Sequence, residues 1–256
     1  MLLATFALWR RDVVRFLRQR SRVVGALGTP VVVWVLLGSG LGSSFRADTA
    51  DGPVGGYLEY FYPGTLALIL LFTAIFSTIS VIEDRDKGFL QGVLVAPVPR
   101  AAIALGKILA GTTLALMQAG VFLLLAPLAN VSISWASLPL MAVVLGTLAF
   151  ALTGLGFMLA WMLDSTQGFH AIMNLFLFPM WLLSGAVFPP AGAAEWIRWV
   201  MLINPMTYGV SAIRGVLASG DMVSATAAVG DSLMFIVVFG AITLALSTAG
   251  VHFRRV

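Results

Sequence analysis

The chain has 256 residues and a formal net charge of +4, and 60% of its residues are hydrophobic while only 10% are charged. Soluble domains are about 45–50% apolar and about 25% charged, so this composition excludes a typical water-soluble fold and indicates an integral membrane protein. The absence of cysteine excludes disulfides, thiolate metal sites and cysteine nucleophiles. The two histidines, His170 and His252, lie far apart in sequence, so we expect no metal site.

Residues 1–22 are predicted to form an amphipathic interfacial helix. At 100° per residue, one side carries Leu2, Leu3, Phe6, Trp9, Val13, Phe16 and Leu17, and the other carries Arg11, Arg15, Arg18 and Arg22. Such a helix lies in the headgroup plane, with its arginines facing lipid phosphates or a protein partner. The alternative is the charged start of a secretory signal, but no small-residue cleavage site is evident after residue 41.

Residues 23–256 are predicted to form a single transmembrane domain. The uncharged apolar runs long enough to span a bilayer are 23–41, 61–82, 108–128, 135–163, 169–188 and 232–251. The fold class is therefore an all-α membrane protein with six transmembrane helices. Gln118 and Asn174 are the most polar central groups of these runs, so both are candidates for a transport pathway.

The segment 83–100, between the second and third runs, has the pattern of a short amphipathic helix. It opens with charged residues and stops at two prolines, and its apolar residues recur at helical spacing: Phe89, Leu90, Val93 and Leu94. Two interpretations remain. The helix is either a connector lying on the membrane or a plug for a groove on a cytoplasmic partner.

The segment 189–231, between the fifth and sixth runs, is too apolar to be an ordinary hydrophilic loop. It contains Trp196 and Trp199, and the Asn204-Pro205 pair interrupts it as a helix break would. We expect two short helices re-entering the outer leaflet, with Trp196, Trp199 and Tyr208 as candidate residues of an outer gate. The alternative is an aromatic belt lying on the surface.

The placement of the basic residues predicts the orientation. They flank the apolar runs, which is typical of topology signals and not of nucleic-acid binding. With the N-terminus in the cytoplasm, twelve basic residues are inside and only Arg46, Arg198 and Arg214 are outside, whereas the acidic residues divide five to six. We therefore expect both termini on the cytoplasmic side of the cell membrane.

The sequence offers no energy source of its own. A secondary transporter carries ionisable groups at mid-membrane, and none of the six runs has a central carboxylate. The Gly106-Lys107 pair has Ala101 where a phosphate-binding loop requires glycine, and Ile108 where it requires serine or threonine. Any ATP and Mg²⁺ are therefore expected on another subunit, and no cofactor is expected in this chain.

Catalysis within the membrane is also not expected. Ser184-Gly185 resembles part of a membrane serine protease motif, but Leu182 stands where that motif needs glycine. Neither histidine has a carboxylate that the sequence identifies as its orienting partner. We therefore assign no catalytic residue.

Two spaced blocks resemble ABC-2 type ABC-transporter permeases. The first is the loop after the second span, with Gly88, Leu90, Leu94, Val95, Pro97, Gly106 and Lys107. The second follows the fifth span and comprises Asn174, Pro179, Ser184, Gly185, Phe188, Pro189, Pro190, Trp196, Asn204, Pro205, Tyr208 and Arg214. Phe89 and Gly92 stand where the family usually has polar residues.

This resemblance implies a half-transporter that pairs with a second copy, as a homodimer, and binds two cytoplasmic ATPase subunits. The residues implied to couple to the ATPase are Asp84, Arg85, Asp86, Lys87, Gly88, Phe89, Leu90, Leu94 and Pro97. The implied activity is export of an amphiphilic drug, lipid or lipid-linked glycan, in contact with membrane lipids. The alternative is a channel or scaffold subunit that has no ATPase partner.

Overall fold

The computed structural model of the chain describes residues 1–42, 48–49, 52–53, 56–219 and 222–253. Six helices of this described part are long and apolar enough to cross a membrane. They confirm the prediction of an all-α membrane protein with six transmembrane helices. Apolar runs fold in this way because a helix satisfies its backbone hydrogen bonds within one segment, where lipid offers no partners.

The first half of the chain contains three spans and two shorter helices. In order these are α1 (Leu2–Arg18), α2 (Arg20–Leu41), α3 (Tyr57–Asp86), α4 (Phe89–Val95) and α5 (Arg100–Leu123). Between α2 and α3, the two-residue strands β1 (Asp48–Thr49) and β2 (Gly52–Pro53) pair antiparallel, with Asp48 opposite Pro53. Gly88, in a left-handed conformation with φ of 74°, turns the chain from α3 into α4.

The second half begins with two 3₁₀ turns, η2 (Ala126–Ala129) and η3 (Trp135–Ser137), before α6 (Leu138–Met162). The fifth span, Thr166–Ala186, is irregular and comprises α7 (Thr166–Ile172), the π-helical η4 (Met173–Leu177), α8 (Phe178–Trp181) and the π-helical η5 (Leu182–Ala186). After it come η6 (Pro190–Gly192), α9 (Glu195–Ile203), α10 (Pro205–Ala218) and α11 (Met222–Phe253). The expected break at Asn204 is present, since α9 and α10 meet there at 84°.

Three helices extend by four residues or more beyond the apolar runs that predicted them. α3 continues to Asp86 instead of ending near residue 82, α5 begins at Arg100 instead of 108, and α11 begins at Met222 instead of 232. In each case a charged residue ended the apolar run without ending the helix. The segment between the fifth and sixth spans, predicted as 189–231, is therefore shorter, because α11 already begins at Met222.

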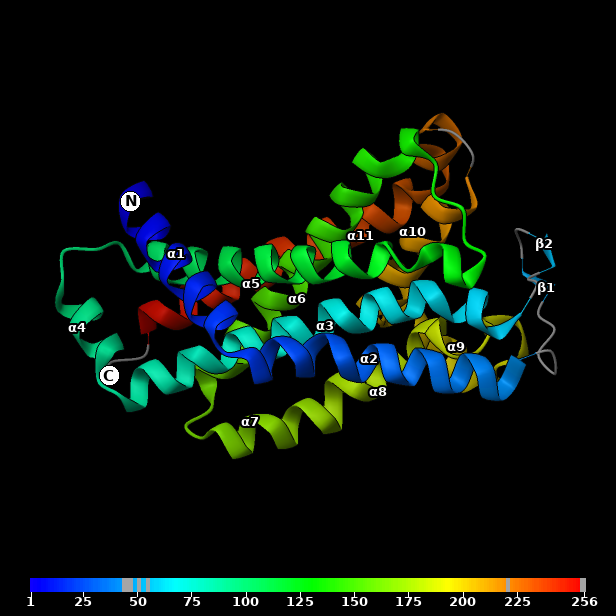
Figure 1. Ribbon diagram of the computed structural model, residues 1–256. Coiled ribbons are helices and arrows are strands. Elements are labelled where there is room, and N and C mark those ends of the chain that lie inside the picture. The colour runs from blue at the N-terminus through cyan, green and yellow to red at the C-terminus, as the bar shows by residue number, and fades with distance from the viewer. Residues whose placement is uncertain (43–47, 50–51, 54–55, 220–221, 254–256) are drawn as a thin grey trace.

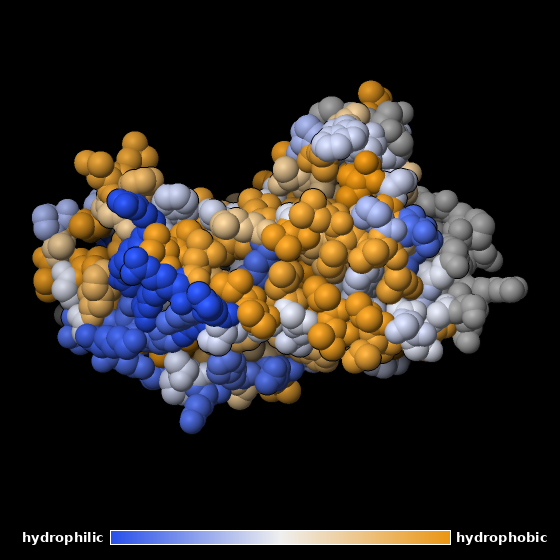
Figure 2. All heavy atoms as spheres, viewed as in Figure 1, coloured by the Kyte–Doolittle hydropathy of each residue, from blue (hydrophilic) through white to orange (hydrophobic). Residues whose placement is uncertain are grey.

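The spans pack around α3, which is the most buried of them and contacts α2, α5 and α6. α1, α4 and the last turns of α11 lie at one end of the molecule, and α9 and the two strands lie at the other (Figure 1). We call these the α4 end and the α9 end. Figure 2 shows hydrophilic side chains gathered at the α4 end and mostly hydrophobic ones over the middle.

α3 and the fifth span approach each other closely at Gly64. A Cβ atom at this position would lie 2.7 Å from Cβ of Ala186 and 2.9 Å from its Cα. Contacts that short involve backbone, so the two segments would have to move apart to accept any side chain. Gly64 thus sets the separation between the central span and the fifth span.

Replacing Gly64 with alanine should destabilise the protein, because overpacking of a close contact costs about 1–3 kcal/mol. We expect Gly64→Ala to lower the melting temperature in detergent by about 2–12 °C. Gly120→Ala is the matched control, since a Cβ at Gly120 of α5 meets no atom within 4 Å. Equal melting temperatures for the two variants would contradict the close approach.

Candidate functional site

The α4 end contains a buried ion pair network centred on Lys107 of α5. The Lys107 side chain is only 4% exposed, and its Nζ lies 2.9 Å from Oδ2 of Asp12 in α1 and 2.7 Å from Oδ2 of Asp84 in α3. Nζ also donates to Oγ of Ser80 at 3.2 Å. A buried ammonium is tolerated only with such partners, so one lysine ties α1, α3 and α5 together.

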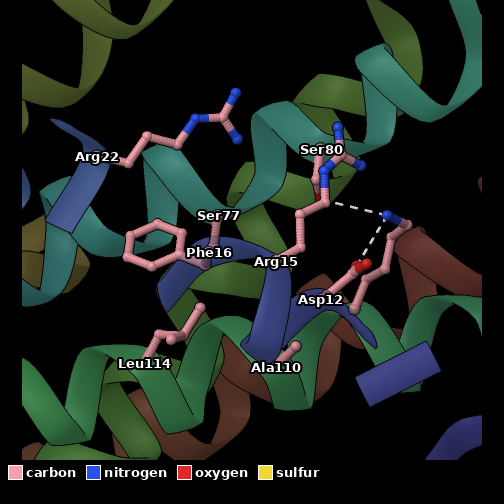
Figure 3. A pocket seen from close by; sticks show the side chains of 9 residues that line it. Asp12, Arg15, Phe16, Arg22, Ser77, Ser80, Ala110 and Leu114 are labelled. Atoms are coloured by element: carbon pink, nitrogen blue, oxygen red, sulfur yellow. Dashed lines mark hydrogen bonds and ion pairs between the residues drawn. The ribbon is translucent and has the colours of Figure 1, made fainter. Parts of the chain in front are cut away.

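Three arginines extend this network. Arg11 and Arg15 of α1 both bind the Asp84 carboxylate, with Nη1 of Arg15 2.7 Å from Oδ1. Arg15 also binds Glu83, as does Arg22 of α2. Together with Lys107 and Asp12 these residues form what we call the ionic cluster. Figure 3 shows Asp12 and Arg15 pointing into a small cavity beside Ser77 and Ser80.

The ionic cluster changes the expected role of α1. The sequence suggested that Arg11, Arg15, Arg18 and Arg22 all face lipid phosphates or a partner, but three of them bind carboxylates of α3. Only Arg18 of the four is exposed. The reason is that Glu83 and Asp84 extend the α3 helix beyond its apolar run and so present carboxylates directly to α1.

Sequence reasoning did not assign Asp12 and Lys107 to a site. A local signal for Asp12 was available in the sequence, because apolar residues, Leu8 and Phe16, stand four positions before and after it on the same helix face. The structure buries all three side chains. Lys107 follows Gly106, where a Cβ atom would lie 2.9 Å from Cβ of Leu8. The Gly106-Lys107 pair thus lets α1 approach α5 and then binds it, which explains the motif without a nucleotide.

Arg85 links α3 to the end of α6. Its guanidinium donates to the carbonyl oxygens of Ala160 at 2.9 Å, Trp161 at 3.2 Å and Leu163 at 3.0 Å, and its Nη1 lies 2.9 Å from Oδ1 of Asp164. These carbonyls belong to the last turn of α6 and the residue after it, where helical partners are lacking. Arg85 therefore acts within the chain as a helix cap.

The remaining residues predicted to couple to an ATPase lie on or beside α4. Leu90 is 1% exposed and Leu94 is partly buried, and both pack against the core of their own chain. The outward face of α4 instead presents Phe89 and Val95, which are 39% and 87% exposed, with Gln91. Leu90 thus anchors α4 and is not available to insert into a partner. Asp86, Lys87, Gly88 and Pro97 are exposed.

A groove of about 460 Å³ separates α4 from α1. It is lined by Ala4, Ala7, Leu8, Gly88, Phe89, Gly92, Val93, Ala96 and Val98. The Arg11 guanidinium carbon lies 3.7 Å from the centre of the Phe89 ring, which attaches α4 to α1 across one end of this groove. Phe89 belongs to both surfaces, since it lines the groove and is exposed on α4.

The fifth span breaks at the α9 end, and side chains from other elements satisfy its carbonyl groups. Gly185 has φ of 80°, so the helix does not continue there. The Gly185 carbonyl accepts hydrogen bonds from the Tyr60 hydroxyl at 2.9 Å and from Nη2 of Arg214 at 3.3 Å. Tyr57 donates to the carbonyl of Val187 at 2.9 Å. These donors replace the lost helical ones, as burial requires.

Asn204, at the bend between α9 and α10, completes this arrangement. Its Nδ2 donates to the carbonyls of Met180 at 2.6 Å and Leu183 at 3.2 Å. Its Oδ1 accepts from the backbone N–H of Met206 and so caps α10. One side chain therefore fixes the bend and joins it to the broken span.

The structure does not join the five predicted pathway and gate residues into one site. In the described part of the chain, no hydrogen bond or ring contact connects any two of them. Gln118 accepts from the Thr73 hydroxyl at 3.0 Å, Asn174 is exposed on η4, and Trp196 and Trp199 are exposed on α9. Tyr208 donates to the Leu202 carbonyl and stacks on Phe235 at 3.9 Å between ring centres.

A family model described as the ABC-2 type transporter matches residues 4–218. Among similar proteins, the putative transport permease ycf38 of Cyanophora paradoxa is 23% identical over 91% of this chain and 84% of its own length. Nodulation protein J of Rhizobium leguminosarum bv. trifolii is 26% identical over 91% of this chain and 88% of its own length. A probable multidrug ABC transporter permease, YbhR, of Escherichia coli K12 is 26% identical over 59% of this chain and 42% of its own.

A double-mutant cycle tests the buried ion pair. Lys107→Met leaves the Asp12 and Asp84 carboxylates without their ammonium partner, and we expect it to cost about 3–5 kcal/mol of unfolding free energy. Adding Asp12→Asn should cost less than the sum of the single changes, with a coupling of about 1–3 kcal/mol. SDS titration in mixed micelles measures these values. The control is a second cycle in which the exposed Asp86 is changed to asparagine together with Lys107→Met. The two costs in that cycle should be additive. Additive costs in the Asp12 cycle as well would contradict the buried pair.

Proposed function

The chain belongs to the ABC-2 type transporter family, and from this membership we propose that separate ATPase subunits drive it to export an amphiphilic substrate. It is the membrane-spanning permease subunit of an ABC transporter. The observation that carries the proposal is the outward face of α4, which is exposed although its opposite face is anchored in the core. ATP and Mg²⁺ bind the partner subunits, which supply the force.

The ATPase docks on the α4 end in this proposal. α4 follows α3 directly through Gly88, and the last turns of α3 carry Asp84 of the ionic cluster and Arg85. A displacement of α4 is therefore transmitted to α1 and α5 through Asp84, and to α6 through Arg85. The apolar groove between α1 and α4 receives a segment of the ATPase.

The α4 end faces the cytoplasm in this proposal, and the α9 end faces outward. The distribution of basic residues supports this orientation, because twelve of the 15 then lie inside. The exposed apolar side chains of α9, Trp196, Trp199, Val200, Leu202 and Ile203, support its insertion into the outer leaflet. The Asn204 bend holds this re-entrant hairpin against the fifth span.

The substrate passes beside the fifth span, between this chain and a second copy. A groove of about 680 Å³ supports this path, and it is lined by Leu155, Leu159, Ile172, Leu175, Phe176, Leu177, Pro179, Met180, Leu183, Val200, Ile203 and Asn204. A groove of this volume with apolar walls suits the hydrophobic part of a drug or lipid. The hydrogen bonds at Gly185 and Asn204 close the outer end and open when the fifth span moves.

The docking proposal predicts a specific effect of Val95→Asp. Val95 is 87% exposed, so the fold should tolerate the change, whereas docking should weaken at least ten-fold because a carboxylate would be buried in the interface. Pull-down of the ATPase and substrate-stimulated hydrolysis measure the effect.

The matched control for this experiment is Val223→Asp, at the start of α11 and 82% exposed. We expect it to leave docking and hydrolysis near normal. Leu90→Asp should instead reduce the yield of folded protein, since Leu90 is buried. Normal docking in Val95→Asp would place the ATPase elsewhere.

The orientation is tested with single cysteines, because the natural chain has none. Gly192→Cys places a thiol on the exposed turn η6, where a Cβ atom meets nothing within 4 Å, and Lys87→Cys places one on the exposed turn before α4. An impermeant maleimide should label Gly192→Cys in intact cells and Lys87→Cys only after permeabilisation. The reverse pattern would invert the proposed topology.

A further inference from the structure

A second groove at the α4 end, distinct from the one between α1 and α4, is lined mainly by arginines. It has a volume of about 490 Å³ and is formed by Arg10, Arg11, Val14, Arg15, Arg18 and Gln19 of α1 and the residue after it. Four of its six lining side chains are cations, and none is acidic. We call it the arginine groove.

The positive charge of the arginine groove is not neutralised within the described part of the chain. Arg11 and Arg15 bind carboxylates of α3, but Nη1 of Arg11 is buried without a hydrogen-bond partner there. Arg10 and Arg18 are exposed, and the described residues give neither an ion pair. The three carboxylates of the ionic cluster, Asp12, Glu83 and Asp84, are bound by four cations, Arg11, Arg15, Arg22 and Lys107. Arg10 and Arg18 add two further positive charges to the groove.

The position of the groove indicates which anion it meets. Leu2, Leu3 and Phe6, at the start of α1, are 86%, 87% and 57% exposed, which is unfavourable in water and favourable in a bilayer. The first span begins at Arg20, directly after the groove. The arginine groove therefore lies at the depth of lipid headgroups, where phosphate is the abundant anion.

We propose that the arginine groove binds the phosphate of an anionic phospholipid. A guanidinium group presents two parallel N–H donors to phosphate oxygens, and several arginines around one hollow offer more than one such pair. Arg10 and Arg18 bind the phosphate from the exposed side. Arg11 lines the groove while its guanidinium continues to hold Asp84.

The bound lipid strengthens the attachment of α1 to the bundle. Arg11 and Arg15 line the groove and also bind carboxylates of α3. A phosphate in the groove therefore joins the same network that fixes α1. The inference rests on the proposed placement of α1 at the membrane surface. It does not require ATPase docking, because the groove is formed by residues of the permease chain itself.

The experiment measures lipid binding to the purified chain. The chain is reconstituted in mixed vesicles of phosphatidylglycerol and phosphatidylcholine, extracted in mild detergent, and its retained lipid is quantified by native mass spectrometry. We expect phosphatidylglycerol to be retained over phosphatidylcholine. The variant Arg10→Gln/Arg18→Gln should bind phosphatidylglycerol roughly ten-fold more weakly.

The matched control is Arg20→Gln/Lys87→Gln, which removes the same charge from two exposed positions at the same end that do not line the groove. It should bind within two-fold of the natural chain. Equal losses in both double variants would overturn the proposal in favour of general surface attraction. Displacement of the lipid by millimolar inorganic phosphate would overturn it in favour of a soluble phosphate ligand. Val95→Asp, which tests ATPase docking, should leave lipid retention unchanged.

Discussion

The cost of burying charge shapes the α4 end of this protein. An ammonium group inside an apolar bundle is stable only when carboxylates surround it, and the two that surround Lys107 come from different helices. Asp12 can reach it only if α1 lies directly across α5, and Gly106 makes that approach sterically feasible. The position of the N-terminal helix therefore depends on Lys107, and on the pairs that Arg11 and Arg15 make with α3, although the helix has the composition of a membrane-surface segment.

The two ends of the molecule satisfy their buried polar groups by different means. At the α4 end, formal charges on α1, α3 and α5 neutralise one another, and Arg85 caps the last turn of α6. At the α9 end, the neutral donors Tyr60 and Asn204, together with the guanidinium of Arg214, satisfy carbonyls released by the broken fifth span. Charged pairs resist separation more strongly than single neutral hydrogen bonds. This difference supports the proposal that the α4 end receives force and that the α9 end opens.

The sequence predicted the features that depend on local composition. Six apolar runs identify the spans, the Asn204-Pro205 pair identifies the bend, and two spaced motifs identify the family. It could not predict the partner of Lys107, because Asp12 lies 95 positions away and only packing brings the two together. It also left the inner face of α4 open, since helical spacing groups Leu90 with Leu94 without saying whether the core or a partner covers them. The break at Gly185 is invisible to hydropathy, because the run around it is uniformly apolar.

α4 carries two separate sets of constraints on seven residues. Its inner face, with Leu90, is fixed by the core, so substitutions there affect whether the permease exists as a folded protein at all. Its outer face, with Gln91 and Val95, is exposed. Sequence drift can therefore alter the outer face at almost no expense in stability. If the ATPase docks on this face, as proposed, paralogous permeases within one cell can diverge there, so that each recruits its own ATPase while the transmembrane architecture stays the same.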